Sequence, residues 1–301
     1  MVWKEVKEVY VWSTKVRPTT LPWLCFTAED AGATIALTKT GSPTSVTIET
    51  STDKWNTWST YTIWDTITLS NVWDKVLFRN SSSTTTNFST SSSSYYKFTI
   101  TWGKAWCSWD VTYLINKDGW VDTIPNNYCF LRLFDSAVNL TTTPELPSTT
   151  LKSYCYRYMF NWCTSLLTAP ELPATTMSTY CYANMFYECT SLTTASALPS
   201  TTLASYCYYY MFRNCSSLTT IPKLPATSMA SYCYGSLFYN CSLVKFSSTQ
   251  TWEYQTAYRI PTSWTGSTAS NWNTNMFTNT WWTYTSNPTI NTTYYTSNTV
   301  V

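Results

Sequence analysis

Cysteine is the residue type in this chain whose spacing most invites a chemical interpretation. Nine of the eleven cysteines recur at intervals of 26 residues. The first column consists of Cys129, Cys155, Cys181, Cys207 and Cys233, and the second of Cys163, Cys189, Cys215 and Cys241. Within a repeat the two columns are eight residues apart, whereas zinc sites pair cysteines about two to four residues apart. We interpret the columns as core thiols, because free cysteine packs as a small hydrophobe.

Disulfide bonds between adjacent repeats stay open as an alternative. Equivalent cysteines of neighbouring repeats would lie near the ~4.8 Å spacing of strands, within the Cα range that allows a disulfide. Some oxidation in an oxidising compartment is therefore compatible with the sequence. We do not predict it, because the count is odd and nine cysteines follow the repeat.

Catalysis finds little support in the residue types. The chain has no histidine, which removes Ser-His-Asp and Cys-His machinery and the commonest metal ligand. A carboxylate pair for glycoside hydrolysis is the alternative that the sequence leaves open. Glu145 and Glu171 are repeat equivalents, but their next counterparts are Ala197 and Lys223. We predict no enzyme, no cofactor and no metal site.

Tyrosine is the better candidate for a functional residue. In four repeats the first-column cysteine has a tyrosine on each side, as in Tyr154-Cys155-Tyr156. Exposed tyrosines with Ser, Thr and Asn suit a binding surface, whereas rings stacked between repeats would only pack, and packing is the favoured of the two interpretations. The candidate binding surface comprises Tyr156, Arg157, Tyr158, Tyr182, Asn184, Tyr187, Tyr208, Tyr209, Tyr210, Arg213, Tyr234 and Tyr239.

The elements that position these residues repeat with the same period of 26, from about residue 129 to 244. A fixed period in this range indicates a solenoid, in which each unit buries its apolar face against its neighbours. The apolar positions from Leu151 to Phe160 predict a short helical or 3₁₀ arc, and residues 166–169 predict a strand that Pro170 ends.

Comparison of the repeats with one another separates core from surface. Positions that keep their character should face inward: Cys155/Cys181/Cys207/Cys233, Phe160/Phe186/Phe212/Phe238 and Leu140/Leu166/Leu192/Leu218. Positions that vary should face water: Arg157/Ala183/Tyr209/Gly235, Tyr158/Asn184/Tyr210/Ser236 and Asn161/Tyr187/Arg213/Tyr239.

The predicted fold class is mainly β with short helical arcs, an N-terminal antiparallel β-sandwich followed by a leucine-rich-repeat solenoid of 26-residue coils. We expect a leader or attachment segment at 1–22 and a β-sandwich at 23–120, where short alternating runs predict strands. About five coils follow at 121–246, and 247–301 form a C-terminal cap or tail.

Composition narrows the classes of partner. Charged residues make up 11% of the chain and the net charge is +2, so the sequence lacks the basic patch that is typical of nucleic-acid binding. No run of 18 apolar residues exists, which predicts no membrane insertion. The first residues lack the apolar core of a secretory signal. Low charge with many Tyr, Ser, Thr and Asn favours an extracellular, cell-surface or virion location.

The repeats carry a resemblance to a known family. The segments LPATTMSTYCYANMFYECTSLTTA (172–195) and LPSTTLASYCYYYMFRNCSSLTTI (198–221) resemble the BspA-like leucine-rich repeats of bacterial surface and phage-associated proteins. Residues 46–80 resemble the Ig-like β-domain that often precedes such repeats. The resemblance implies surface adhesion or recognition, without a shared set of catalytic residues.

The repeats and the resemblance lead to two hypotheses about function. The first is a non-enzymatic recognition or adhesion protein whose solenoid binds a protein or glycan on a cell surface. The alternative is a structural virion component, such as part of a tail fibre, or a cell-envelope component in which the solenoid is a spacer. The missing signal favours the alternative, and the varied exposed positions favour the first. The oligomeric state is not predicted.

Tryptophan is anomalous in both number and place. The chain has seventeen Trp and six Gly, and many of the Trp stand where a turn is expected, including Trp55, Trp73, Trp109, Trp120, Trp162, Trp281 and Trp282. Turn tips favour glycine or asparagine, which tolerate positive φ. We hypothesise that many of these residues are glycine in the natural protein, with UGA codons read as Trp. The alternative is a Trp-rich binding surface. Trp58, inside a strand-like run, is expected to be genuine.

Overall fold

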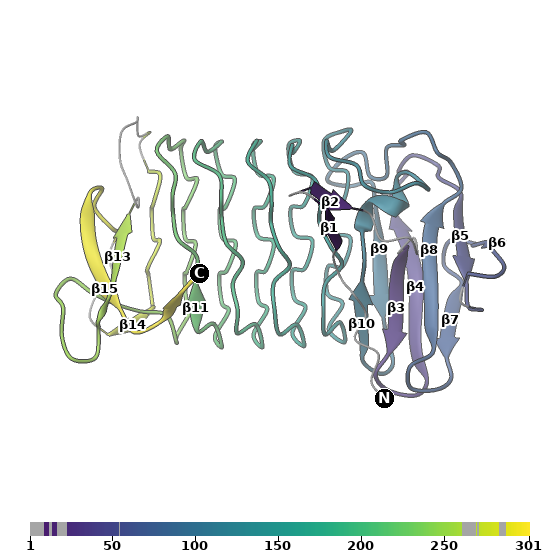
Figure 1. Cartoon of the computed structure of the whole chain (residues 1–301), viewed down its shortest axis with the longest axis horizontal. Coiled ribbons are helices and arrows are strands. Elements are labelled where there is room, and N and C mark those ends of the chain that lie inside the picture. The colour runs from purple at the N-terminus through teal and green to yellow at the C-terminus, as the bar shows by residue number, and fades with distance from the viewer. Residues whose placement is uncertain are drawn as a thin grey trace.

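The computed structural model describes residues 9–11, 14–16, 23–53, 55–260, 269, 271–282 and 287–301. The fold is mainly β, with several antiparallel sheets, none of them closed, and almost no helix. The molecule is elongated, with strands at both ends and a row of similar turns lying side by side between them (Figure 1). Most of the expected 1–22 leader lies outside the described residues, apart from the hairpin β1 (Val9–Val11) and β2 (Thr14–Val16).

Two antiparallel sheets occupy the N-terminal end. The first has the order β10-β3-β8-β5-β6 and comprises β10 (Ala105–Ser108), β3 (Leu24–Ala28), β8 (Lys75–Asn80), β5 (Ile48–Ser51) and β6 (Ser59–Thr60). The second has the order β7-β4-β9, from β7 (Thr66–Leu69), β4 (Ala33–Thr40) and β9 (Tyr95–Ile100). Phe26 of the first sheet meets Phe98 of the second with 4.8 Å between ring centroids, so the two sheets share a core.

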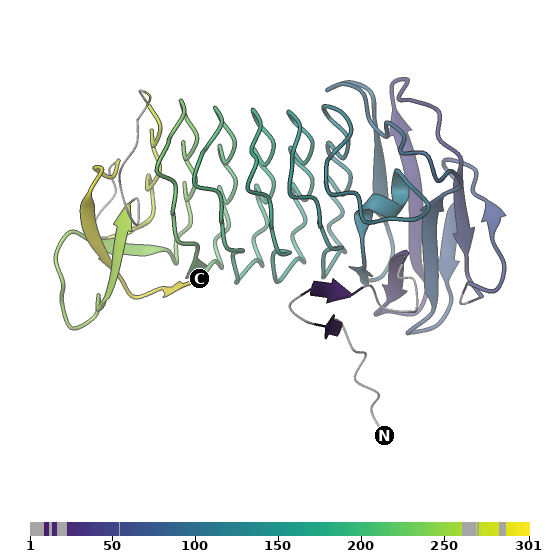
Figure 2. The same cartoon turned by 45° about the horizontal axis from the view of Figure 1, so that its top comes forward.

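The row of turns is built by two alternating kinds of backbone hydrogen bond. Cys155 N–H donates to the Lys152 carbonyl three residues back, which closes a turn. The next residue, Tyr156, donates to the carbonyl of Cys181, its neighbour's equivalent one repeat later, at 2.9 Å. This alternation continues from Tyr154 to Cys163 and through the equivalent residues of the other repeats, a segment that we call the ribbon. Figure 2 shows the repeats stacked in register.

The expected helical arcs are wrong. Every fourth residue of the ribbon has a left-handed backbone, with φ of 62° at Tyr154, 59° at Tyr158 and 59° at Trp162. A right-handed helix cannot contain such residues, so the N–H groups bond between repeats instead. Among the described residues the one helical element is the 3₁₀ turn η1 (Val111–Leu114), which precedes the repeats.

The expected strand at 166–169 is wrong as well. That segment contributes an isolated parallel bridge between Thr168 and Thr194, with no strand. A short strand at the equivalent place, β11 (Thr220–Ile221), pairs in parallel with β16 (Thr299–Val300) near the chain's end. The proline-bounded segments therefore meet mostly through single bridges.

The predicted inward positions are confirmed. The side chains of the cysteine, phenylalanine and leucine columns are fully buried. The phenylalanine rings form one continuous stack that starts in β9, with members Phe98, Phe134, Phe160, Phe186, Phe212, Phe238 and Phe277. Neighbouring centroids are 5.4 to 6.0 Å apart, the distance of offset-stacked rings.

Several positions expected to face water are instead buried. Ala183, Asn184, Gly235 and Ser236 are all nearly inaccessible. The Tyr209 ring covers Gly235 so closely that a Cβ there would meet Tyr209 Cδ2 at 2.9 Å. The variation in side-chain size at these positions therefore reflects complementary packing between adjacent repeats.

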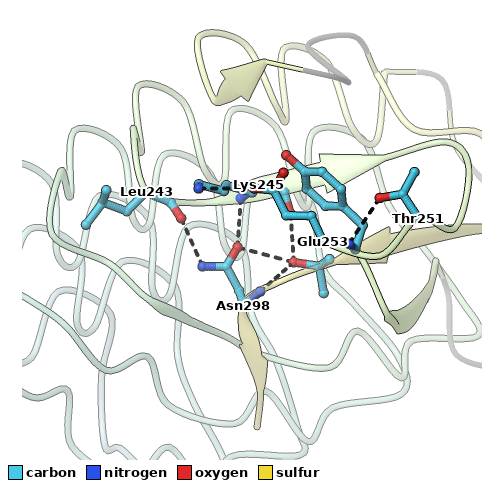
Figure 3. Close-up of polar contacts among 7 residues, drawn as sticks. Leu243, Lys245, Thr251, Glu253 and Asn298 are labelled. Carbon is cyan, nitrogen blue, oxygen red and sulfur yellow. Dashed lines mark hydrogen bonds and ion pairs between the residues drawn. The ribbon is translucent and has the colours of Figure 1, made fainter.

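Besides the pairing of β11 with β16, one asparagine links the C-terminal strands to the last repeats (Figure 3). Asn298 donates from Nδ2 to the carbonyls of Thr219 and Leu243, and its Oδ1 accepts from Lys245 N–H at 2.7 Å. The sheet beside it has the order β13-β15-β12-β14, from β13 (Thr256–Ile260), β15 (Thr292–Thr296), β12 (Lys245–Ser247) and β14 (Trp281–Trp282). Residues 272–278 accept the hydrogen bonds of the last ribbon, for example Phe238 N–H to the Met276 carbonyl.

A stability comparison tests this description of the ribbon. Phe186→Ala should lower the free energy of unfolding by about 3–5 kcal/mol, because it opens the ring stack. Asn184 is buried with φ of 58°, so Asn184→Ala should cost about 1–2 kcal/mol, while Asn184→Gly should cost much less. Urea unfolding measures all three. Equal losses for the Ala and Gly variants at position 184 would contradict the left-handed assignment.

Candidate functional site: a tyrosine–arginine strip

The left-handed ribbon positions place a column of tyrosines at the surface. It consists of Tyr128, Tyr154, Tyr180, Tyr206 and Tyr232, all half-buried. Neighbouring centroids are 4.5 to 5.0 Å apart and the ring planes differ by 10°. Because each inner ring is covered on both faces, the column offers ring edges and phenol groups. It is suited to hydrogen bonding more than to stacking against a sugar.

Arginine side chains lie over a ring of this column and over tyrosines outside it. The Arg157 guanidinium is 4.8 Å from the Tyr158 ring and 5.0 Å from the Tyr180 ring. Arg213 similarly lies 4.4 Å from Tyr239 and 4.7 Å from Tyr210. Cation–π contact of this kind holds the guanidinium plane in place without neutralising its charge.

The arginines differ in their pairing. Arg132 forms an ion pair with Asp135, with 2.6 Å between Nη1 and Oδ2. Arg157 and Arg213 have no carboxylate partner among the described residues, and the Nε of each is buried without a hydrogen bond. We call the tyrosine column, the two unpaired arginines and Tyr158, Tyr187, Tyr209, Tyr210 and Tyr239 the tyrosine–arginine strip.

The structure brings seven of the twelve predicted surface residues together in this strip. They are Arg157, Tyr158, Tyr187, Tyr209, Tyr210, Arg213 and Tyr239, each half-buried. Burial and aromatic neighbours, Tyr210 first among them, raise the pKa of Tyr209. The Tyr209 phenol therefore keeps its proton at neutral pH and can donate a hydrogen bond.

The other five predicted surface residues are corrections. Tyr156, Tyr182, Tyr208 and Tyr234 are fully buried, and Asn184 is buried beside them. In a ribbon of turns the cysteine and the tyrosine after it both point inward, so the exposed ring is the one before the cysteine. The candidates that were missed are therefore the tyrosines before each cysteine, Tyr128, Tyr154, Tyr180, Tyr206 and Tyr232. The one sequence signal for them is Asn184, four residues after Tyr180, because Asn tolerates positive φ.

The buried side chains behind the strip are inert. Burial raises the pKa of the Cys181 thiol to about 12. In the second column, Cys189 Sγ donates to the Phe160 carbonyl at 3.0 Å, and Cys215 bonds equivalently to Phe186. All eleven cysteines are buried thiols that act as core residues. Those of the second column also form weak hydrogen bonds between repeats.

Other site chemistries find no support in the described part of the chain. No three cysteine, aspartate or glutamate side chains there lie close enough to hold a metal ion together. An open groove of about 420 Å³ runs between Ala169–Pro173 and Ala195–Pro199, and Glu171 is the one carboxylate in its lining. Glycoside hydrolysis needs two carboxyl groups across the bond, which this groove lacks. No helix in the described ranges is long and apolar enough to cross a membrane.

No protein-family model, curated protein or solved structure matches this chain. The geometry of the strip is consequently the basis for the function proposed below.

The buried thiols lead us to predict how the free energy of unfolding depends on pH. Their folded-state pKa values lie above the unfolded value of about 8.5, so their contribution to stability is present below that pH and lost as pH rises. We expect the free energy of unfolding to be constant up to about pH 8 and then to fall. Urea titrations at several pH values measure it.

Thiol labelling provides the control. With a disulfide-exchange reagent at about pH 8, no cysteine should react in the folded protein and all eleven should react in urea. Rapid labelling of the folded chain, or stability that does not fall with rising pH, would contradict the inert-core interpretation.

Proposed function

We propose that the chain is a non-enzymatic recognition protein of an extracellular, cell or virion surface, which binds a protein or glycan partner through the tyrosine–arginine strip. In this proposal residues 121–246 form a BspA-like leucine-rich-repeat solenoid and residues 23–120 an Ig-like β-sandwich. The period of 26 residues and the hydrogen bonds between equivalent residues of successive repeats support the first assignment. The two antiparallel sheets with a shared core support the second.

The observation that carries the proposal is the pair of unpaired arginines in an aromatic surface. Arg157 and Arg213 each lose part of their hydration to the rings beneath them, and neither meets a carboxylate in the described residues. A partner that brings a carboxylate or sulfate group would form a charge-assisted hydrogen bond there. Tyr and Arg are also the side chains most enriched where binding energy concentrates.

A structural role in a virion or cell envelope is the second candidate, with the repeats as a spacer. Two features favour this role. The phenylalanine stack is continuous, and the N-terminal sheets and the C-terminal segment cover the two ends of the repeats. In that case attachment would depend on residues 1–22, and the strip would have no ligand.

A binding screen with the full chain tests the proposal. The probes are an array of acidic and neutral glycans, and intact host cells. The double variant Arg157→Gln/Arg213→Gln should weaken binding to the acidic probes by about tenfold or more, equivalent to about 1.4 kcal/mol. The loss should shrink at high salt.

Two control variants separate the strip from other effects. Arg79→Gln removes the same charge from β8, where Arg79 pairs with Glu49, and Tyr182→Phe alters a buried ring. Both should leave binding unchanged. If the full chain binds none of the probes while particle assembly requires residues 1–22, the spacer function replaces this proposal.

A further inference from the structure

Left-handed backbone in the N-terminal part of the chain is confined to two residue types. Among described residues from 23 to 127, φ is positive at four glycines, namely Gly32, Gly41, Gly103 and Gly119. It is also positive at five other residues, all of them tryptophan: Trp55, Trp64, Trp73, Trp109 and Trp120. No Asn, Asp or other residue occupies such a position in this range, although Asn is abundant in the chain.

Tryptophan is a poor choice for these positions. Its Cβ collides with the following carbonyl when φ is positive, and glycine alone avoids the collision. The loops cannot relax out of the conformation without losing hydrogen bonds, since Trp64 N–H donates to Leu37 and Trp73 N–H to Ala28. Burial does not offset this strain at three of the five positions, while Trp109 and Trp120 are half-buried. Trp55, Trp64 and Trp73 are 52%, 60% and 64% exposed.

Other tryptophans of the same region are well placed. Trp23 and Trp58 meet edge to face at 4.9 Å, and the Arg79 guanidinium lies 3.8 Å from the Trp58 ring. Neither has a positive φ. The region therefore contains packed tryptophans with an ordinary backbone and left-handed tryptophans, besides Trp102, which is 73% exposed and has no positive φ.

The repeats contain one more member of the second class. Trp162 has φ of 59° and is 47% exposed. The equivalent left-handed positions hold Ser136, Glu188, Asn214 and Asn240. The left-handed tyrosines differ, because the rings of the tyrosine column stack on one another from Tyr128 to Tyr232. Tyr158 and Tyr210 instead contact arginine guanidinium groups. Trp281 and Trp282, also expected at a turn tip, lie in strand β14 and do not belong to this class.

We propose that glycine stands in the natural protein at the six left-handed positions Trp55, Trp64, Trp73, Trp109, Trp120 and Trp162. The simplest cause is a source whose UGA codons specify glycine, read here as tryptophan. The indoles at these positions, four of them exposed, are then no part of any binding surface. This inference is independent of the proposed function, which uses none of these residues.

The codons of the gene and the mass of the natural protein test the inference directly. We expect UGA at the six positions and UGG at Trp23 and Trp58. Peptide mass spectrometry of the protein from its natural source should show glycine at the six positions. UGG codons there, or tryptophan in the natural peptides, would overturn the proposal.

Melting temperatures of variants test whether glycine is favoured over tryptophan at the left-handed positions. Trp55→Gly, Trp73→Gly and Trp162→Gly should each raise the melting temperature, by about 2 °C. The matched control Trp58→Gly should lower it, because it removes a packed ring. A fall in melting temperature at all three left-handed positions, as large as that of the control, would overturn the argument that glycine is the residue these turns require.

Discussion

The stacking of one phenylalanine ring per repeat is the interaction on which the rest of the molecule depends. The stack begins at Phe98 in β9 and ends at Phe277 in the C-terminal segment. A 26-residue unit with short hydrogen-bonded turns has too little apolar area to fold alone. Each ring gains two covered faces only when both neighbouring repeats are present, so the N-terminal sheets, the repeats and the C-terminal segment stabilise one another along a single axis.

The surface strip follows from the same stacking. Fixing the phenylalanine and buried tyrosine columns at repeat spacing also fixes the half-exposed tyrosines outside them at 4.5 to 5.0 Å. Their faces are then occupied, and the arginines settle over rings that are already in place. The chemistry of the strip, phenol edges and guanidinium groups, is thus a consequence of the core's geometry.

The sequence predicted the buried columns because their side chains keep their character from repeat to repeat. It did not predict the left-handed ribbon, since Tyr154, Tyr158 and Glu188 carry no signal for positive φ. Within the repeats that signal comes from Asn184, Asn214 and Asn240. The error in the helical arcs had further effects. A helix would turn Tyr156 outward and Asn184 toward water, whereas the ribbon buries both. Trp55 was recognisable as a turn tryptophan from its polar neighbours Lys54 and Asn56. Trp64 was not singled out, although an apolar residue precedes it and Asp follows it, as at Trp73.

The alternating hydrogen bonds of the ribbon give the stack a direction. At each described bond from one ribbon to the next, the N–H group belongs to the earlier repeat and the carbonyl to the later one, from Tyr128 and Ser153 to Asn240 and Thr278. The dipoles of these alternate ribbon peptides, about 3.5 D each, therefore add along the long axis, although the ribbon contains no helical turn. Outside the ribbon some bonds run the opposite way, for example from Thr175 N–H to the Thr149 carbonyl. Unpaired carbonyls would accumulate partial negative charge at the N-terminal face of the first repeat. There Phe98 of β9 donates its N–H to the Leu133 carbonyl, so the N-terminal sheets neutralise one pole of a macrodipole as well as covering an apolar end.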